Sequence, residues 1–333
     1  MQKKIYVIIA VVFISCATYL GKSDKLINYV DPFIGSGGHG HVFVGANVPF
    51  GGVQVGPTNF NKGWDWSSSY HHTDSIVKGF CHINVSGTGM SDLGELTIMP
   101  ATGKLMTGAG TQNNHMAGYS SLYYKDKEHV SVGYYKVHLE RYDIDVELTA
   151  TERVGLHKYR FPKSDQSRII IDLGEGSADR PTETYLKKIN DTLFQGHRFS
   201  SGWARDQREY FSLIISKPVD DFILYDRHKK FKGEERKGDY VKGFLEFSTK
   251  SNENIMVKMG ISTVSSKNAL ENMMIELPHW DFSKVKKDAE KKWEEELSKI
   301  KIKTDDIKKK RVFYTAMYHT MIAPNLYHDL NGE

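Results

Sequence analysis

The 333-residue chain has 39% hydrophobic, 12% aromatic and 26% charged residues, a composition typical of a globular protein with two domains or with one large β domain and an extension. Its formal net charge of +4 is local, because residues 284–311 hold twelve Lys and Arg against seven Asp and Glu. Acids and bases are interspersed there as on a solvated helix face, and no basic patch is interleaved with stacking aromatics, so we expect no nucleic-acid partner.

The N-terminus has the features of a secretion signal. The short basic start MQKK precedes an unbroken apolar run at residues 5–14, which is too short to span a bilayer but suits the core of a signal peptide. Ser15-Cys16-Ala17 follows and resembles a bacterial lipobox. We therefore expect a signal peptide within residues 1–22, acylation of Cys16, and membrane contact only through this lipid anchor. The alternative is ordinary signal-peptidase cleavage nearby.

From residue 26 to residue 265 the sequence predicts β structure. Short extended runs separated by Gly, Pro, Asn and Asp occupy residues 130–139, 144–161, 167–174, 208–219, 244–250 and 254–264. Several of these runs alternate apolar with polar residues, which places one face in a core and the other in solvent. Because no long amphipathic helix separates the runs, we expect a mostly β, antiparallel sandwich rather than a βαβ sheet.

At about residue 266 the apolar period changes to that of helices. One expected helix, over residues 269–277, carries Leu270, Met273, Met274 and Leu277 on one face, and a second carries Val285, Ala289, Trp293, Leu297 and Ile300. A third runs over residues 308–324 and stops before Pro324. We expect residues 266–333 to be linker helices and the beginning of a helical domain, because nothing in the sequence closes their packing.

Three glycine-rich, hydrogen-bonding segments lie at residues 34–57, 63–74 and 79–96. The GSGGHG stretch of the first lacks the strand-to-helix context of a dinucleotide loop. Metal binding is a second alternative, with His39, His41, His71, His72 and His82 as the available ligands. These histidines lie among Ser, Gly and Asn, without an H-E-x-x-H motif or a cysteine pair. We therefore expect no metal site in this chain.

The second segment, GWDWSSSYHHTD at residues 63–74, suits a carbohydrate. Sugar rings stack their C–H faces on Trp and Tyr, whereas their hydroxyls bond to Asp, His, Asn and Ser. Trp64-Asp65-Trp66 alternates these two requirements. We therefore expect a sugar-facing loop rather than core, the alternative being a polar turn with one Trp tucked into the core.

Five segments carry a resemblance to a known family: residues 29–57, 64–96, 147–162, 196–218 and 313–326. In this order they resemble the N-terminal part of glycoside hydrolase family 92, calcium-dependent exo-acting α-mannosidases. The resemblance implies a β-sandwich of the supersandwich type over residues 26–265, then an (α/α)6 barrel that residues 266–333 only begin. The active site would lie where the two parts meet.

On this resemblance, residues 63–74 line the sugar pocket, with Trp64 or Trp66 stacking near the leaving-group sugar. The expected substrate-binding residues are Trp64, Asp65, Trp66, Tyr70, His71, His39, His41, His82, Ser86 and Asp92. Val44, Ser67, His72 and Asn84 depart from the family's usual residues.

The family inverts the anomeric centre with an acid and a base about 6.5–9.5 Å apart. The resemblance places these carboxylates, and most ligands of the Ca²⁺ ion, in the barrel. We therefore expect no catalytic residue and no metal ligand in this chain, and no activity of the chain by itself.

Three functions stay open. The first is the sugar-facing domain of a secreted, inverting exo-α-mannosidase that trims α-mannosides from N-glycans or mannan. Its partners would be α-mannoside glycans and its own barrel, in the periplasm or at the outer-membrane surface of a Gram-negative bacterium. The second is a non-catalytic carbohydrate-binding or scaffolding module, and the third is a related glycoprotein-catabolic enzyme.

Overall fold

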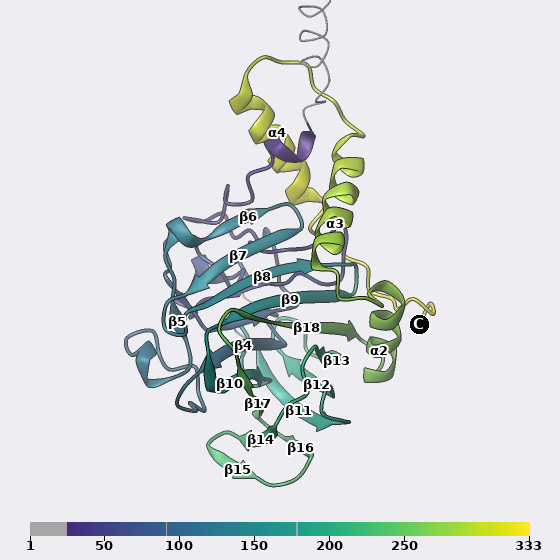
Figure 1. The fold of residues 1–333 in the computed structure, drawn as a ribbon. Coiled ribbons are helices and arrows are strands. Elements are labelled where there is room, and N and C mark those ends of the chain that lie inside the picture. Colours follow the sequence, from purple (N-terminus) through teal and green to yellow (C-terminus); the bar gives the residue numbers. More distant parts are fainter. Residues whose placement is uncertain (1–24, 91, 178) are drawn as a thin grey trace, which may run out of the picture.

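Two antiparallel sheets form most of the molecule in the computed structural model, which describes residues 25–90, 92–177 and 179–333 (Figure 1). The nine-stranded sheet has the order β16-β11-β12-β13-β18-β9-β8-β7-β6, and the seven-stranded sheet has the order β1-β3-β4-β10-β17-β14-β15. A further pair, β2-β5, lies outside both sheets. The expected signal peptide and Cys16 lie outside the described residues.

The strands of the nine-stranded sheet are β6 (His129–Ser131), β7 (Tyr134–Leu139), β8 (Ile144–Ala150), β9 (Val154–Phe161), β11 (Arg180–Lys188), β12 (Leu193–Ser201), β13 (Gln207–Ile215), β16 (Glu235–Gly238) and β18 (Glu253–Ser262). Those of the seven-stranded sheet are β1 (Gly56–Thr58), β3 (Gly79–Cys81), β4 (Thr97–Thr102), β10 (Ser164–Asp172), β14 (Asp221–Asp226), β15 (Lys229–Phe231) and β17 (Val241–Thr249). The small pair is β2 (Ile76–Val77) and β5 (Ser121–Leu122).

Alternation along β8 shows why these sequences pack as a sandwich. Ile144, Val146 and Leu148 are fully buried in the core between the sheets. The residues between them face outward, where Glu147 forms an ion pair with Lys158 of β9 at 2.6 Å. Apolar burial on one face and cross-strand ion pairs on the other stabilise a sheet whose two faces differ.

The helices follow the sandwich: α2 (Ser266–Glu276), α3 (Phe282–Leu297) and α4 (Ile307–Thr320). Each begins after a capping residue, because Ser265, Asp281 and Asp306 accept a hydrogen bond from the backbone N–H three residues on. Short 3-10 helices lie at η1 (Leu26–Tyr29), η2 (Trp64–Trp66), η3 (His115–Ala117) and η4 (Lys125–Lys127). The predicted mostly β sandwich followed by helices is thus confirmed.

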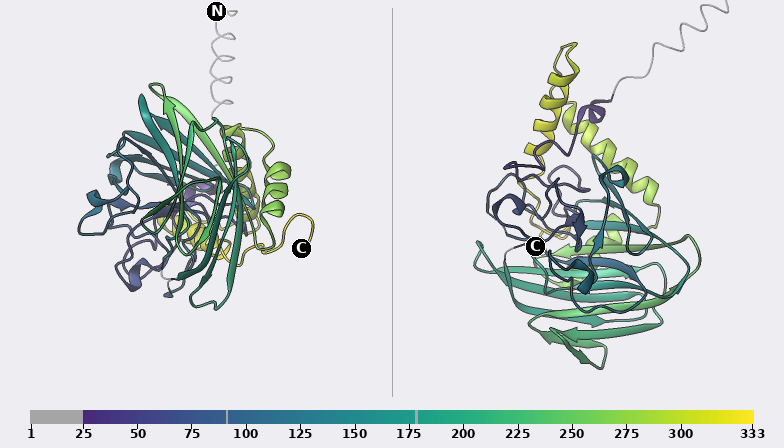
Figure 2. Two further views of the ribbon diagram at one scale, coloured as in Figure 1. Left: turned by 90° about the horizontal axis from the view of Figure 1, so that it is seen from below. Right: turned by 90° about the vertical axis from the view of Figure 1, so that its left-hand side faces the viewer.

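The helices pack on the sandwich in two places. Helix α2 lies on β18 and β13, whereas α3 contacts β8, and α3, α4 and η1 pack together at one end of the sandwich (Figures 1 and 2). Of the residues predicted to face a core, Met274 and Ile300 are instead 54% and 53% exposed. Met274 lies at the edge of the buried stripe of α2, whereas Ile300 lies beyond the end of α3 at Leu297 and so is not part of that helix face.

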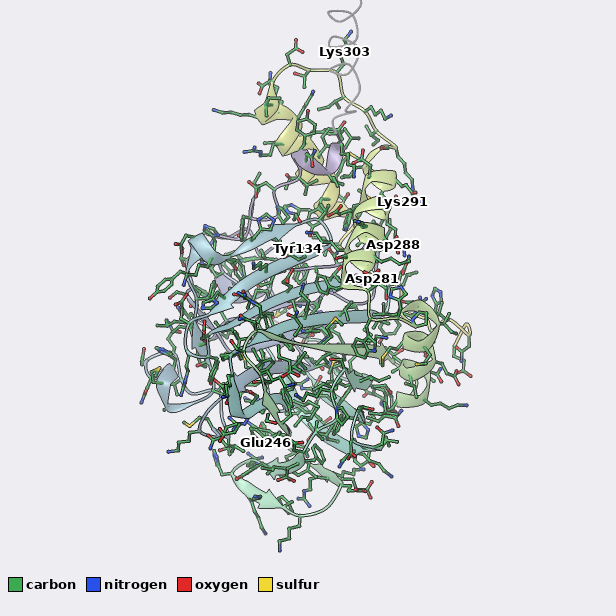
Figure 3. All side chains as sticks on the ribbon, viewed as in Figure 1. Tyr134, Glu246, Asp281, Asp288, Lys291 and Lys303 are labelled. Atoms are coloured by element: carbon green, nitrogen blue, oxygen red, sulfur yellow. The ribbon has the colours of Figure 1, made fainter. Side chains whose placement is uncertain are left out.

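The charged run predicted to be solvated extends from α3 over the connecting segment to the first turn of α4. Lys284 forms an ion pair with Asp288, and Lys291 with Glu295, one helical turn apart. Figure 3 locates Asp288 and Lys291 along α3. No helix within the described ranges has both the length and the apolar character needed to cross a bilayer.

Candidate functional site

Three loops of the first hundred residues, at residues 35–41, 63–74 and 86–90, pack against one another, and we call their solvent-facing side the three-loop surface. Backbone hydrogen bonds join them, from His72 N to the carbonyl of Ser36 at 2.8 Å and from Gly87 N to the carbonyl of His41 at 2.7 Å. The hydroxyl of Ser67 donates to the carbonyl of Thr88 at 2.9 Å. The loops therefore hold one another in place.

Two glycines allow the loops to approach this closely. A Cβ atom at Gly40 would lie 2.0 Å from the carbonyl oxygen of Gly35, so the first loop closes on itself only with glycine there. A Cβ atom at Gly89 would lie 2.5 Å from Nε1 of Trp64. The third loop thus approaches the indole closely at Gly89.

Trp64 presents an aromatic face to solvent. It lies in η2 and is 57% exposed. The ring of His41 meets its indole edge-on at 4.2 Å between centroids, and the ring of His39 lies at 5.1 Å. An exposed indole flanked by two imidazoles and a glycine is an aromatic platform of the kind that stacks on a sugar ring.

Polar groups lie directly beside this platform. Nδ1 of His39 lies 2.6 Å from Oδ1 of Asp65, and Nε2 of His41 lies 3.6 Å from the same oxygen. The hydrogen bond from His39 lowers the pKa of Asp65 below its ordinary value. The predicted residues Trp64, Asp65, His39 and His41 therefore lie together.

Trp66 points away from the platform and braces the loop. Its indole N–H donates to Oδ2 of Asp74 at 3.0 Å, and its ring stacks on His71 at 4.3 Å. Lys62 forms an ion pair with the same Asp74 at 2.8 Å. Of the two tryptophans considered for stacking, Trp64 is the one with its face exposed.

The expectation that residues 63–74 are not core is correct only for the first part of the segment. Ser67, Ser68, Ser69, Tyr70, His71 and Asp74 are buried. Tyr70 is 1% exposed and donates to Glu128 at 3.0 Å, and burial raises its pKa above the ordinary range. A polar segment enters the interior here because most of its hydroxyl and imidazole groups find partners there, the hydroxyl of Ser68 being the exception among the described residues.

His82 is likewise an interior residue. It is fully buried, its Nδ1 lies 2.7 Å from the carbonyl oxygen of Leu96, and its Nε2 lies 2.9 Å from Nε2 of His157. Burial lowers the pKa of His82 to about 4. His82 and Tyr70 can influence a ligand on the surface only through the groups that they position.

Ser86 and Asp92 are close in the sequence, but their side chains contact different parts of the structure. The hydroxyl of Ser86 accepts a hydrogen bond from Phe43 N at 3.1 Å, which fixes the start of the third loop. Oδ2 of Asp92 accepts from Gln207 Nε2 at 2.7 Å, whereas its Oδ1 has no partner among the described residues. Asp92 faces a separate cavity.

That cavity, of about 290 Å³, lies between the sandwich and residues 325–329. Polar lining groups that the sequence did not indicate are Arg153, Gln207, Glu209 and Asp329. Burial raises the pKa of Glu209 well above its ordinary value, which favours the neutral acid. These residues come from different elements, so no local motif marks them.

The described residues do not fit the calcium ion that the family resemblance implies. Among them, one group of three metal-ligating side chains converges: His39, His41 and Asp65. Calcium takes six to eight oxygen ligands, whereas two of these three groups offer nitrogen. No calcium-dependent step can be derived from this chain.

Comparisons with known proteins match the whole described architecture. The family model "Glycosyl hydrolase family 92 N-terminal domain" matches residues 29–262, and the model "Glycosyl hydrolase family 92 catalytic domain" matches residues 268–333. A protein of Arthroderma benhamiae named "Uncharacterized secreted glycosidase" is 25% identical over an alignment that covers 92% of this chain and 42% of that protein.

Solved structures agree with these matches. The family GH92 alpha-mannosidase BT3965 from Bacteroides thetaiotaomicron is 33% identical, with a TM-score of 0.89, over 93% of this chain and 43% of that one. A second structure of that enzyme, in complex with mannoimidazole, is 34% identical over 92% of this chain and 41% of that one, again with a TM-score of 0.89. The chain thus spans less than half the length of these relatives.

Proposed function

The chain belongs to glycoside hydrolase family 92, and from this premise we propose that it is the sugar-facing domain of a secreted, inverting exo-α-mannosidase that trims α-mannosides from N-glycans or mannan. The family match over residues 29–262 and the likeness to an alpha-mannosidase support this proposal. So does the complex of that relative with mannoimidazole.

The observation that carries the proposal is the exposed face of Trp64 beside Asp65 and His39. A pyranose ring stacked on the indole would have its hydroxyls within reach of a carboxylate and an imidazole, and both groups bond well to hydroxyls. On this proposal the chain's own residues bind and orient one sugar unit and exclude water from one of its faces.

The chemistry itself is assigned to other residues of the enzyme. An inverting glycosidase needs a carboxylic acid and a carboxylate about 6.5–9.5 Å apart. We place this pair, and the oxygen ligands of a calcium ion, in the catalytic domain, in the part of the relatives that this chain does not span. The relative named as a secreted glycosidase supports secretion. Acylation of Cys16 and a periplasmic or outer-membrane location in a Gram-negative bacterium complete the proposal.

A binding experiment tests the role of the platform. The full chain is titrated with a panel of α-linked mannobioses, and binding is followed by tryptophan emission and by ligand-observed NMR. We expect Trp64→Ala to remove binding, because stacking on an aromatic face supplies much of the affinity for a sugar. Trp203→Ala is the matched control, since Trp203 is 75% exposed but lies outside the three-loop surface.

Two outcomes would contradict the proposal. Equal binding by the native chain and by Trp64→Ala would remove the platform from the site. Release of mannose from an aryl α-mannoside by the chain alone would contradict the assignment of the acid and base to residues outside it.

A further inference from the structure

We propose that His39, His41 and Asp65 form a binding site for a divalent transition-metal ion, with zinc the ion that suits them best. One ligand atom from each of these three side chains lies within 4.8 Å of the others. The histidines come from one loop of the three-loop surface and the carboxylate comes from another. In the part of the chain that the structure describes, no other trio of His, Cys, Asp or Glu side chains converges in this way.

The spacing of the donor atoms is close to that of a tetrahedral site. At a metal–ligand distance of about 2.0 Å, the ligand atoms of a tetrahedral ion lie about 3.3 Å apart. Nε2 of His41 is 3.6 Å from Oδ1 of Asp65, and Nδ1 of His39 is 2.6 Å from it. An ion between them therefore requires the His39 ring to withdraw by about 0.7 Å. That side chain is 73% exposed, so it can withdraw without disturbing the core.

His41 provides an independent indication that the cluster takes a ligand. Its side chain is only 5% exposed, yet its Nε2 atom has no hydrogen-bond partner among the residues that the structure describes. The nearby oxygen of Asp65 at 3.6 Å lies beyond hydrogen-bond distance. A buried ring nitrogen without a partner is costly, and a metal ion held by Asp65 would satisfy it.

The backbone at His41 directs this nitrogen to the cluster. His41 has a φ of 55°, in a region that residues other than glycine rarely occupy. The hydrogen bond from Gly87 N to the carbonyl of His41 holds this conformation. Backbone strain of this kind persists where its surroundings fix it and occurs often at ligand sites.

The donor set selects the class of metal. Imidazole nitrogen suits zinc, copper and nickel, whereas calcium and magnesium prefer oxygen. Two histidines and one carboxylate match a zinc site that keeps one position open. His39 binds as the tautomer with its proton on Nε2, and both imidazoles stay neutral. The motif His39-Gly-His41 is visible in the sequence, but its carboxylate partner lies 26 residues after His39.

A metal ion at this place would connect two loops and fix the platform above them. Trp64 contacts the rings of both histidines. Ligation would stop those rings from turning, so the indole would lose its freedom to tilt. This inference does not depend on whether the platform binds mannosides.

Zinc chloride alone is the probe for the test. The untagged full chain is stripped with EDTA, and zinc binding is measured by isothermal titration and by metal analysis after dialysis. We expect one zinc ion per chain, and binding at least about tenfold weaker in His39→Ala and in Asp65→Asn, since even outer partners of a metal site contribute that much. Both side chains are at least partly exposed, so neither variant should fail to fold.

Two controls place the ion at the cluster. His228→Ala removes an exposed histidine elsewhere and should bind zinc like the native chain. Cobalt(II) should quench part of the tryptophan emission, and this part should be absent in Trp64→Phe. Calcium chloride in excess should not displace zinc. The proposal is wrong if less than one ion binds in the native chain, or if His39→Ala and Asp65→Asn bind as tightly as it does.

Discussion

A chain of three buried side chains illustrates how single residues are held inside this sandwich. The hydroxyl of Tyr159 lies 2.7 Å from Nδ1 of His157, and Nε2 of His157 lies 2.9 Å from Nε2 of His82. If Tyr159 donates, His157 must carry its proton on Nε2 and donate to His82. His82 then carries its proton on Nδ1 and donates to the carbonyl of Leu96. Every donor has an acceptor only while both imidazoles are neutral.

This arrangement predicts a stability that depends on pH. Burial lowers the pKa of His82 to about 4 and that of His157 well below its ordinary value. Between about pH 6.5 and pH 4 the unfolded chain binds protons that the folded chain does not, so stability is present above the unfolded pKa and is lost as the pH falls below it. The loss is about 1.4 kcal/mol per pH unit for each histidine.

Denaturant unfolding at pH 7, 6 and 5 measures this dependence. His157→Gln keeps hydrogen-bonding groups but cannot titrate, so its free energy of unfolding should fall less steeply with decreasing pH. His228→Gln, at an exposed turn, serves as the control and should keep the native slope. Identical slopes for His157→Gln and the native chain would show that this histidine already binds its proton in the fold.

At the scale of residues, the sequence shows which side chains are aromatic, polar or charged, but it does not show how deeply they are buried. Trp64, Asp65, His39 and His41 were predicted as site residues, and the structure places them together. Tyr70 and His82 have the same polar character and are predicted as site residues as well, but both are buried. Burial depends on which loops cover a residue, and neighbouring residues in the sequence do not carry that information.

Strand β12 shows at the scale of elements that burial cannot be inferred from the sequence pattern alone. Along β8 the inward positions are Ile, Val and Leu, so the alternation predicted a strand. Along β12 the buried positions after Phe194 are Gly196, Arg198 and Ser200, which have no apolar period. A strand whose inner face is polar is recognised only when the partners of that face are known.

The close approach of the third loop to Trp64 leads to a prediction at the scale of elements. In Gly89→Ala the new Cβ would lie 2.5 Å from Nε1 of Trp64, so the indole must tilt away from the third loop. Because Trp64 is an exposed side chain that can move, the free energy of unfolding should change by about 1 kcal/mol or less. Binding of α-mannobioses should weaken and tryptophan emission should shift.

Gly108→Ala is the matched control for this prediction, since a Cβ at Gly108 meets no atom within 4 Å. That variant should keep native emission and native sugar binding. If Gly89→Ala binds mannobioses as the native chain does, the orientation of Trp64 on the third loop does not matter for binding.

For the whole molecule, the order of the family segments predicted a sandwich followed by helices, but not what joins the two sheets. Arg198 on β12 of the nine-stranded sheet is fully buried and forms ion pairs with Glu95 and Asp179. Glu95 precedes β4 of the seven-stranded sheet, and Arg198 also donates through Nε to the carbonyl of Leu173, directly after β10, at 3.0 Å. One guanidinium therefore links both sheets and two carboxylates in the interior. Burial and the neighbouring Asp179 raise the pKa of Glu95 to about 8, whereas the charge of Arg198 opposes this shift.

Removal of this cation should be the most damaging of the changes considered. Arg198→Met fills a similar volume but leaves the carboxyl groups of Glu95 and Asp179 buried without a positive partner, which should lower the free energy of unfolding by about 3–5 kcal/mol. Glu95→Gln should cost less, because Arg198 keeps Asp179 as its partner. Arg208→Met tests an arginine on the adjacent strand whose ion pair with Asp206 is more than half exposed, and it should change stability by about 0.5 kcal/mol or less. Denaturant unfolding of the full chain measures all three variants. Equal losses for Arg198→Met and Arg208→Met would mean that the buried cluster contributes no more to joining the sheets than an ion pair on the surface.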